Sequence, residues 1–456
     1  MNVEEMKQLQ PCHAGRIARL LGLSFQIPDD LKVKAVLLRS AMRFWAALTT
    51  CLALAMLSQH TAFALDLGKT GAALGLQPSD SMFKAVASIN ETFAPTALAF
   101  SPDGNYLADT GMYEPIVHVW DVHTHSLVRT LPGGKVVDFH SITWSRNGRY
   151  LAACDNYSRR QSVTIWSTTT WTPVIQLNQG SGQCLSPAFS GDSTLFAYGD
   201  VEGDIYVYDT TTWKLVNSAV YAYEPGKNKC IPVKCPSITV LQGKQVTFIP
   251  SRSDLAFAVD GLFAEDNPPA AIKSLDFVNT NRLVLWNPTQ PPPNLDHPNP
   301  QDVLLLYGKQ PLLAPDPRSP GAPRNRADPI LDAIAFAPDG QTFATGTRAG
   351  DVKIWNLHPF REIAHPLRGA FPIVAGGAAT LQYTSDGTHL LVIFDGIGFP
   401  YSLGKLVAIN ARTDAVEDIL PVSNYGALAY SGKNHLVATG GAWLGRAYRI
   451  FIWKFR

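Results

Sequence analysis

The sequence predicts an all-β fold: a ring of seven four-stranded sheets that is closed by a strand from the N-terminal part of the chain, with a ring of eight sheets as the alternative. One strand–turn–strand pattern recurs from residue 95 to the C-terminus. The 35 glycines and 33 prolines favour many turns over long helices. Charged residues make up only 16% of the chain, which excludes intrinsic disorder and a coiled coil as its main structure.

Each copy of the pattern begins with two apolar strands around a tight turn. Alternating apolar residues predict half-buried strands. Proline at the second position of a turn and glycine at the fourth suit a tight connection. In the first copy, TALAF precedes the turn Ser-Pro-Asp-Gly and NYLADT follows it. The seven turns occupy residues 101–104, 145–148, 190–193, 250–254, 337–340, 384–387 and 431–434.

The third strand of each copy ends in a large side chain, which can fill the gap between neighbouring copies. A single meander of three or four strands cannot bury both of its faces. Radial stacking of the copies buries them and leaves only short sheet edges. The residues at the end of the third strand are Trp120, Trp166, Tyr208, Trp286, Trp355, Ile409 and Trp453.

The last copy has no fourth strand of its own before Arg456. Residues 82–90 precede the first copy and have a strand pattern, with Phe83, Ala85, Ala87 and Ile89 on one side. We therefore predict that this segment pairs beside 450–453 and completes the seventh sheet, which removes an exposed edge.

These repeats resemble the WD-repeat β-propeller family from about residue 82 to the C-terminus. The resemblance is carried by the SPDG-like turns and by three third strands, Val-x-Val-Trp120-Asp121, Val-x-Ile-Trp166 and Val-x-Ile-Trp355-Asn356. The Gly-His pair that the family has before each first strand is missing, and His140 is a partial echo of it. Such divergence resembles exported bacterial members, or the related quinoprotein-like and lactonase-like propellers.

The N-terminal segment predicts export. Residues 44–57 form an apolar run of 14 residues, shorter than the ~20 that a membrane-spanning helix needs. Ala62-Phe63-Ala64 supplies a signal-peptidase pattern. We expect a signal peptide at 42–64, cleaved after Ala64, and a periplasmic or secreted protein; the alternative is a membrane anchor formed by 44–64.

Two further segments flank this signal peptide. Residues 1–41 are either an annotation extension ahead of Met42 or a cytoplasmic tail. Residues 65–81 form a linker, and residues 82–456 form a single propeller domain.

Four cysteines remain after this cleavage, and an even number outside the cytosol allows disulfides with three connectivities. Cys230 and Cys235 enclose only four residues, so we favour that pair. A bond between Cys154 and Cys184 is a second candidate. The alternative is that some of the four are buried thiols.

The loops predict where a partner binds. Insertions at 221–243, 259–281 and 288–329 interrupt the repeats, and 288–329 holds 12 of the prolines. Most of them fall on the face opposite the short turns. Aromatic and arginine side chains on that face are either interface anchors or residues that pack the loops against the sheets. They are Tyr157, Arg159, Arg160, Phe399, Tyr401, Trp443, Arg446 and Tyr448.

Signals for catalysis are weak, and we expect no cofactor, no catalytic residues and no metal ligands. His123 and His125 lie on one side of the chain and could bind a metal, but a solvated turn is the more common structure for such a pair. The net charge of +1 gives no indication of nucleic-acid binding. Membrane association is expected only through an uncleaved signal segment.

The sequence thus favours a monomeric, non-catalytic scaffold that binds a protein through its loop-rich face, a function that rests largely on the WD-repeat resemblance. The alternative is a lactonase- or quinoprotein-like enzyme with a site at the central channel.

Overall fold

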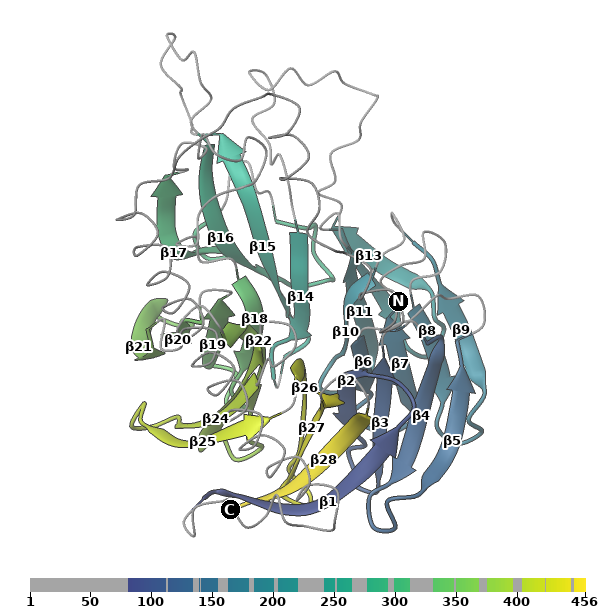
Figure 1. Ribbon diagram of the computed structural model, residues 1–456. Helices are drawn as coiled ribbons and strands as arrows, with labels where there is room; N and C mark the ends of the chain where they lie inside the picture. The colour runs from purple at the N-terminus through teal and green to yellow at the C-terminus, as the bar shows by residue number, and fades with distance from the viewer. Residues whose placement is uncertain are drawn as a thin grey trace, which may run out of the picture. The chain divides into compact units, whose positions relative to one another are not determined.

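The strands of the computed structural model form seven antiparallel four-stranded sheets, which are the blades of a propeller (Figure 1). The structure describes residues 81–456 apart from these gaps: 112–113, 134–138, 140, 155–162, 180–183, 201–203, 220–241, 251, 265–276, 294–298, 312–330, 348–349, 369–374, 397–403, 423 and 444–446. Both the all-β class and the count of seven blades are confirmed, and the eight-blade alternative is wrong.

Blades one to three contain β2 (Pro95–Phe100), β3 (Tyr106–Gly111), β4 (Ile116–Asp121) and β5 (Leu127–Pro132); β6 (Ser141–Trp144), β7 (Tyr150–Cys154), β8 (Val163–Ser167) and β9 (Pro173–Leu177); and β10 (Cys184–Phe189), β11 (Leu195–Asp200), β12 (Ile205–Asp209) and β13 (Leu215–Ala219). Blades four and five contain β14 (Gln242–Phe248), β15 (Leu255–Ala264), β16 (Phe277–Trp286) and β17 (Val303–Pro311); and β18 (Leu331–Phe336), β19 (Thr342–Thr347), β20 (Val352–Asn356) and β21 (Arg361–Leu367). Blade six contains β22 (Ala375–Tyr383), β23 (His389–Gly396), β24 (Gly404–Asn410) and β25 (Val416–Val422), and blade seven contains β26 (Asn424–Ser431), β27 (Leu436–Trp443), β28 (Ala447–Phe455) and β1 (Phe83–Glu91).

The short turns between first and second strands have the backbone that their sequences predict. In blade one, the Gly104 amide donates to the Ser101 carbonyl at 2.9 Å, and Gly104 has φ +76°. A residue with a side chain rarely adopts that conformation. Gly148, Gly340 and Gly387 occupy the same position in three other blades with φ between +64° and +72°. In these four blades the glycine therefore marks a left-handed position that ends the turn, and Ser193 adopts the same conformation in blade three with φ +61°.

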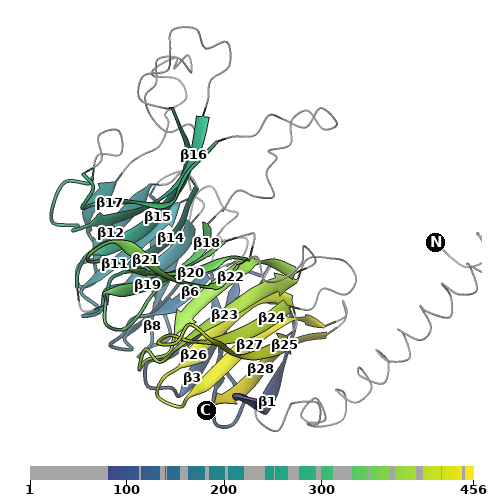
Figure 2. The ribbon, with the colours of Figure 1, turned by 90° about the vertical axis from the view of Figure 1, so that its left-hand side faces the viewer.

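The core is divided among the blade interfaces. Seven clusters of buried apolar side chains are described, and each lies between two adjacent blades. The Trp at the end of the third strand belongs to such a cluster in all five blades that have one, as expected for a gap-filling residue. Figure 2 shows the sheets stacked side by side in this way.

The N-terminal strand closes the ring as predicted. β1 pairs antiparallel with β28, from Phe83 opposite Phe455 to Glu91 opposite Tyr448. The two strands lie beside each other in both views (Figures 1 and 2). Ser81 Oγ and the Met82 amide also reach Asp418 Oδ2 of blade six, at 2.6 and 2.7 Å.

The predicted single apolar side of β1 is wrong in one respect. The pairing register shifts between Ala85 and Ala87, which is a β-bulge. Phe83 and Ala85 therefore pack into the cluster between blades six and seven, whereas Ala87 and Ile89 pack into the cluster between blades seven and one. One strand thus contributes to both interfaces of the closing blade.

The insertion predicted at 259–281 is shorter than expected. β15 and β16 continue to pair as far as Ala264 opposite Phe277. Glycine and polar residues in DGLFA and FVNTN obscured these strand ends in the sequence. Similarly, β17 extends to Pro311 within the segment 288–329. The predicted insertion at 221–243 and the signal segment at 42–64 lie outside the described residues, except for Gln242 and Gly243 of β14.

Among the described residues, no helix is long and apolar enough to cross a bilayer.

Candidate functional site

The predicted partner-binding residues lie almost wholly outside the described part of the chain. Tyr157, Arg159, Arg160, Phe399, Tyr401 and Arg446 fall in its gaps. Trp443 ends β27, but its side chain is not described. Tyr448 is half-buried in β28 and lies opposite Glu91 of β1. The loop-rich face therefore remains a prediction.

A cavity of about 650 Å³ lies at the centre of the ring. Its lining comes from the first strands of six blades, β2, β6, β10, β14, β22 and β26, and from turns that follow them. The first-to-second-strand turns contribute Pro102, Arg146, Ser385 and Lys433. The cavity therefore reaches the face that carries the short turns, opposite most of the predicted insertions.

The lining combines partly exposed rings with two cations. Phe100, Trp144 and Phe189 are half-buried, and Arg146 and Lys433 are exposed. None of the described residues that line the cavity is Asp, Glu or His. The described lining thus offers apolar contact and positive charge.

Hydrogen bonds between neighbouring first strands hold this cavity in shape. Trp144 Nε1 donates to the Ala99 carbonyl at 3.0 Å, which joins blades two and one. The Tyr430 amide donates to Gln382 Oε1 at 3.0 Å, which joins blades seven and six. These contacts fix the lining before any ligand arrives, which lowers the ordering cost of binding.

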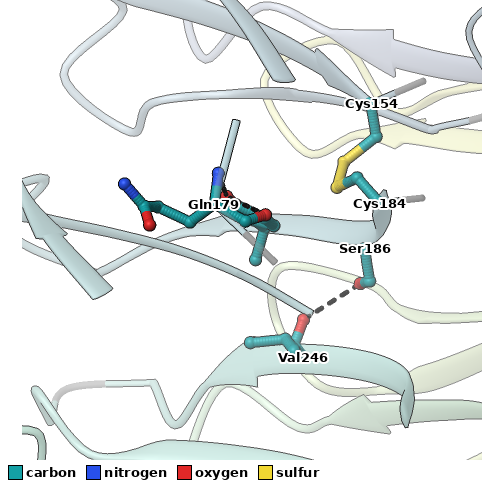
Figure 3. The surroundings of a disulfide bond; sticks show 6 residues. Cys154, Gln179, Cys184, Ser186 and Val246 are labelled. Carbon is teal, nitrogen blue, oxygen red and sulfur yellow. Dashed lines mark hydrogen bonds between the residues drawn. A yellow bond between two sulfur atoms is a disulfide. The ribbon is translucent and has the colours of Figure 1, made fainter. Parts of the chain in front are cut away.

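A disulfide joins blades two and three at the end opposite the short turns. Cys154 closes β7, Cys184 opens β10, and their Cα atoms lie 5.3 Å apart. Beside it, Ser186 Oγ donates to the Val246 carbonyl of blade four at 3.2 Å (Figure 3). The favoured pair, Cys230 and Cys235, lies outside the described residues.

A buried group of two carboxylates and one imidazole lies between blades seven and one. We call Glu91, Asp109 and His118 the closure cluster. His118 Nδ1 lies 3.0 Å from Glu91 Oε1 and 3.1 Å from Oε2. One ligand atom from each of the three residues lies within 4.8 Å of the others. Burial, followed by the charge of Glu91, raises the pKa of Asp109 well above its usual range.

The closure cluster is separate from the central cavity and was missed by the sequence analysis. Its members lie on three strands, β1, β3 and β4, and none lines the cavity. Sequence reasoning considered only His123 and His125 in this region as possible metal ligands. The structure places those two in the turn after β4, where the His123 amide donates to Asp121 Oδ1 at 2.9 Å. Strand register places His118 opposite Asp109, and packing between blades seven and one brings His118 to Glu91.

Comparison with known proteins agrees with this architecture. The sequence model of the family described as WD domain, G-beta repeat matches residues 86–121 and 327–356. These two segments are therefore similar to WD repeats. The first matched segment covers most of β1 and the first three strands of blade one, and the second covers the first three strands of blade five. No curated protein matches the chain.

Proposed function

We propose that this propeller is a non-catalytic scaffold that binds a segment of a partner protein in its central cavity. The observation that carries the proposal is the lining: partly exposed aromatic rings in a preformed cavity beside two exposed cations. Aromatic anchors and arginine are enriched among the residues that dominate protein interfaces. WD-repeat propellers are commonly interaction scaffolds, which supports the same function.

The charge of the lining selects among partner segments. Arg146 and Lys433 stand at the turn end of the cavity, and no described lining residue is acidic. A segment with an apolar side chain for the cavity and a carboxylate near its mouth fits this arrangement best. Such complementarity raises the association rate and selects against basic segments.

Charge reversal at the cavity mouth tests the proposal. The variant Arg146→Glu/Lys433→Glu changes two exposed side chains and is expected to leave the fold intact. Proteins captured from an envelope extract by the wild type, and identified by quantitative mass spectrometry, should be depleted at least tenfold with this variant. Arg129→Glu on the outer strand β5 is the matched control, since Arg129 is exposed and far from the lining.

The same capture experiment distinguishes binding at the central cavity from binding at the loop-rich face. Arg159→Glu/Tyr401→Ala changes candidates of the loop-rich face. If this variant loses the captured partner and the cavity variant keeps it, binding occurs through the loops and the cavity proposal is wrong. If all variants capture the same proteins as the wild type, the scaffold function at either face is contradicted.

We also propose that the protein works outside the reducing cytosol. The disulfide between Cys154 and Cys184 supports this proposal, because structural disulfides persist mainly in oxidising compartments. N-terminal sequencing of the mature protein should begin at Leu65, after Ala64. An intact N-terminus on a soluble cytosolic protein would contradict export.

A further inference from the structure

We propose that the closure cluster is a Zn²⁺ site that fastens the N-terminal strand to blade one. Glu91 ends β1, whereas Asp109 and His118 lie opposite each other on β3 and β4. A shared metal ion would therefore connect the last strand of blade seven to two strands of the first blade. This role is independent of partner binding at the central cavity.

The spacing of the three donors suits one metal ion. Two ligands bound tetrahedrally to Zn²⁺ at ~2.0–2.1 Å lie roughly 3.3 Å apart. His118 Nδ1 and Glu91 Oε2 are 3.1 Å apart, close to this separation. Asp109 supplies the third donor within 4.8 Å of both. Carboxylate oxygens and imidazole nitrogens both bind Zn²⁺, and the mixture of oxygen and nitrogen disfavours Mg²⁺ and Ca²⁺.

Each carboxylate has one oxygen that accepts hydrogen bonds from residues outside the cluster, and the second oxygen of Glu91 lies 3.1 Å from His118 Nδ1. Trp120 Nε1 donates to Asp109 Oδ1 at 2.6 Å. The amide and hydroxyl of Thr92 donate to Glu91 Oε1 at 2.6 and 3.0 Å. Such outer hydrogen bonds are typical around metal-binding carboxylates, because they fix the orientation of the ligand.

The second oxygen of Asp109 is the independent observation that points to a ligand. Asp109 is fully buried, and its Oδ2 has no hydrogen-bond partner among the described residues. A buried carboxylate oxygen without a partner is destabilising. A metal ion bound to it would remove that penalty.

The charges of the site also balance. Glu91 and Asp109 as carboxylates with a neutral His118 carry −2, which one Zn²⁺ neutralises. The His118 ring is positioned by its neighbours: Phe93 stacks on it at 5.1 Å, and Trp120 meets it edge-on at 5.7 Å. The alternative arrangement is a proton retained on Asp109, and metal binding has to displace that proton. Zinc affinity should therefore rise with pH.

A second histidine of the chain provides a matched control. His365 also has two carboxylates nearby, but they approach different ring nitrogens: Asp351 lies 3.3 Å from Nε2 and Glu362 lies 4.0 Å from Nδ1. These donors diverge from the ring, and all three side chains are less buried than those of the closure cluster. His365→Gln should therefore leave zinc binding unchanged.

The experiment measures metal content and stability in the full chain. Because the cluster is buried, the protein is refolded with Zn²⁺, dialysed and assayed by elemental analysis. The wild type and His365→Gln should retain one equivalent of zinc, whereas Asp109→Asn and His118→Gln should retain at least tenfold less. A Zn²⁺ excess of about 100-fold over Kd should raise the Tm of the wild type by roughly 3 °C, and Mg²⁺ should not.

Asp109→Asn keeps the proposal falsifiable even if other variants unfold. Asparagine imitates the protonated carboxyl and can still accept the Trp120 hydrogen bond, so this variant should fold. Co²⁺ should give visible d–d absorption of an ordered site in the wild type and none in Asp109→Asn. Zinc retention equal in wild type and Asp109→Asn, or no zinc retained by the wild type at pH 8, would overturn the metal site and leave a shared proton in its place.

Discussion

Blades one and five are the two that the WD-repeat family model matches. In each, a buried tryptophan ends the third strand, but the acceptor of its indole hydrogen bond differs. In blade five, Trp355 Nε1 donates to the neutral hydroxyl of Thr345 at 2.8 Å. In blade one, Trp120 Nε1 donates to the carboxylate of Asp109 at 2.6 Å. Both acceptors lie on the second strand, two residues beyond the one opposite the tryptophan. The repeat therefore fixes where an acceptor stands but not its charge.

Two other blades extend this comparison. Blade seven repeats blade five, with Trp453 Nε1 donating to Thr439 Oγ1 at 3.1 Å. Blade two has Ala153 at the corresponding position, and its buried Trp166 Nε1 has no partner among the described residues. A tryptophan that packs well is thus tolerated with a hydroxyl acceptor, a carboxyl acceptor or none.

Removal of the closing strand should disrupt blade seven and its interfaces with blades six and one, while blade five keeps its neighbours. Deleting residues 65–90 removes Phe83 and Ile89 from two interfaces and leaves β28 as an exposed edge. We expect a large loss of stability and aggregation, measured by thermal unfolding and light scattering.

Deletion of residues 65–80 is the control for that experiment. It retains Ser81 and Met82, which contact Asp418, and should be nearly neutral. An unchanged Tm after deletion of 65–90 would contradict the closure.

The interface between blades two and three differs from that between blades seven and one because a disulfide crosslinks it. The disulfide joins residues 30 apart, and the chain-entropy model gives about 3–4 kcal/mol for a loop of that size. Cys154→Ser/Cys184→Ser should therefore lower the free energy of unfolding by roughly that amount, measured in urea without reductant. Reductant should destabilise the wild type but not this variant; equal sensitivity would indicate that another bond, such as the predicted Cys230–Cys235 pair, is responsible.

Replacing the acceptor in blade five tests whether the tryptophan bond matters there. Thr345→Val keeps the side-chain shape but leaves the largely buried Trp355 Nε1 without its hydroxyl acceptor. We expect a loss of about 1–3 kcal/mol in the free energy of unfolding. In a double-mutant cycle, adding Trp355→Phe should reduce the cost of Thr345→Val. Strict additivity would show that the two side chains do not interact.

The third position of the short turns is occupied by an aspartate in some blades and by a neutral asparagine in blade two. In blade six, burial opposes ionisation of Asp386, but hydrogen bonds from Thr384 and Thr388 lower its pKa to about 2. Because this pKa lies below that of the unfolded chain, Asp386 stabilises the fold above about pH 4, and this contribution is lost as pH falls towards 2.

Blade two has Asn147 in the corresponding turn, where it accepts from Ser145 Oγ at 2.8 Å. Asp386→Asn should therefore convert the charged turn to the neutral version and reduce the loss of stability between pH 4 and 2. Acid titration of the Tm measures it, and identical slopes for wild type and variant would refute the assignment.

Sequence reasoning identified features that depend on local pattern. The turns, the strand pairs around them and the closing strand follow from alternation and from the Pro and Gly positions. The bulge in β1 could not be predicted, because alternation through Phe83, Ala85, Ala87 and Ile89 is uninterrupted and the register shift arises only from pairing with β28.

Long-range sites were missed for a related reason. The closure cluster combines residues 91, 109 and 118, whose spacing matches no metal motif. It forms because one blade edge meets the middle strands of the next. The central cavity likewise combines side chains from six blades, and those of any one strand form no recognisable binding motif by themselves.

The smallest expected effect comes from giving blade two the acceptor that it lacks. Ala153 faces blade one beside Trp166, in the position that Thr345 and Thr439 occupy in blades five and seven. Ala153→Ser adds a hydroxyl there with less bulk than threonine, and should raise the free energy of unfolding by about 0.5–1 kcal/mol if it bonds to Trp166 Nε1. Ala152→Ser is the matched control, because Ala152 is equally buried but packs toward blade three, away from Trp166. At position 152 the new hydroxyl has no tryptophan N–H to accept from, so Ala152→Ser should lower the free energy of unfolding. If both variants lose stability equally in urea titrations, blade two has no room for the bond, and the equivalence of the tryptophan positions does not extend to it.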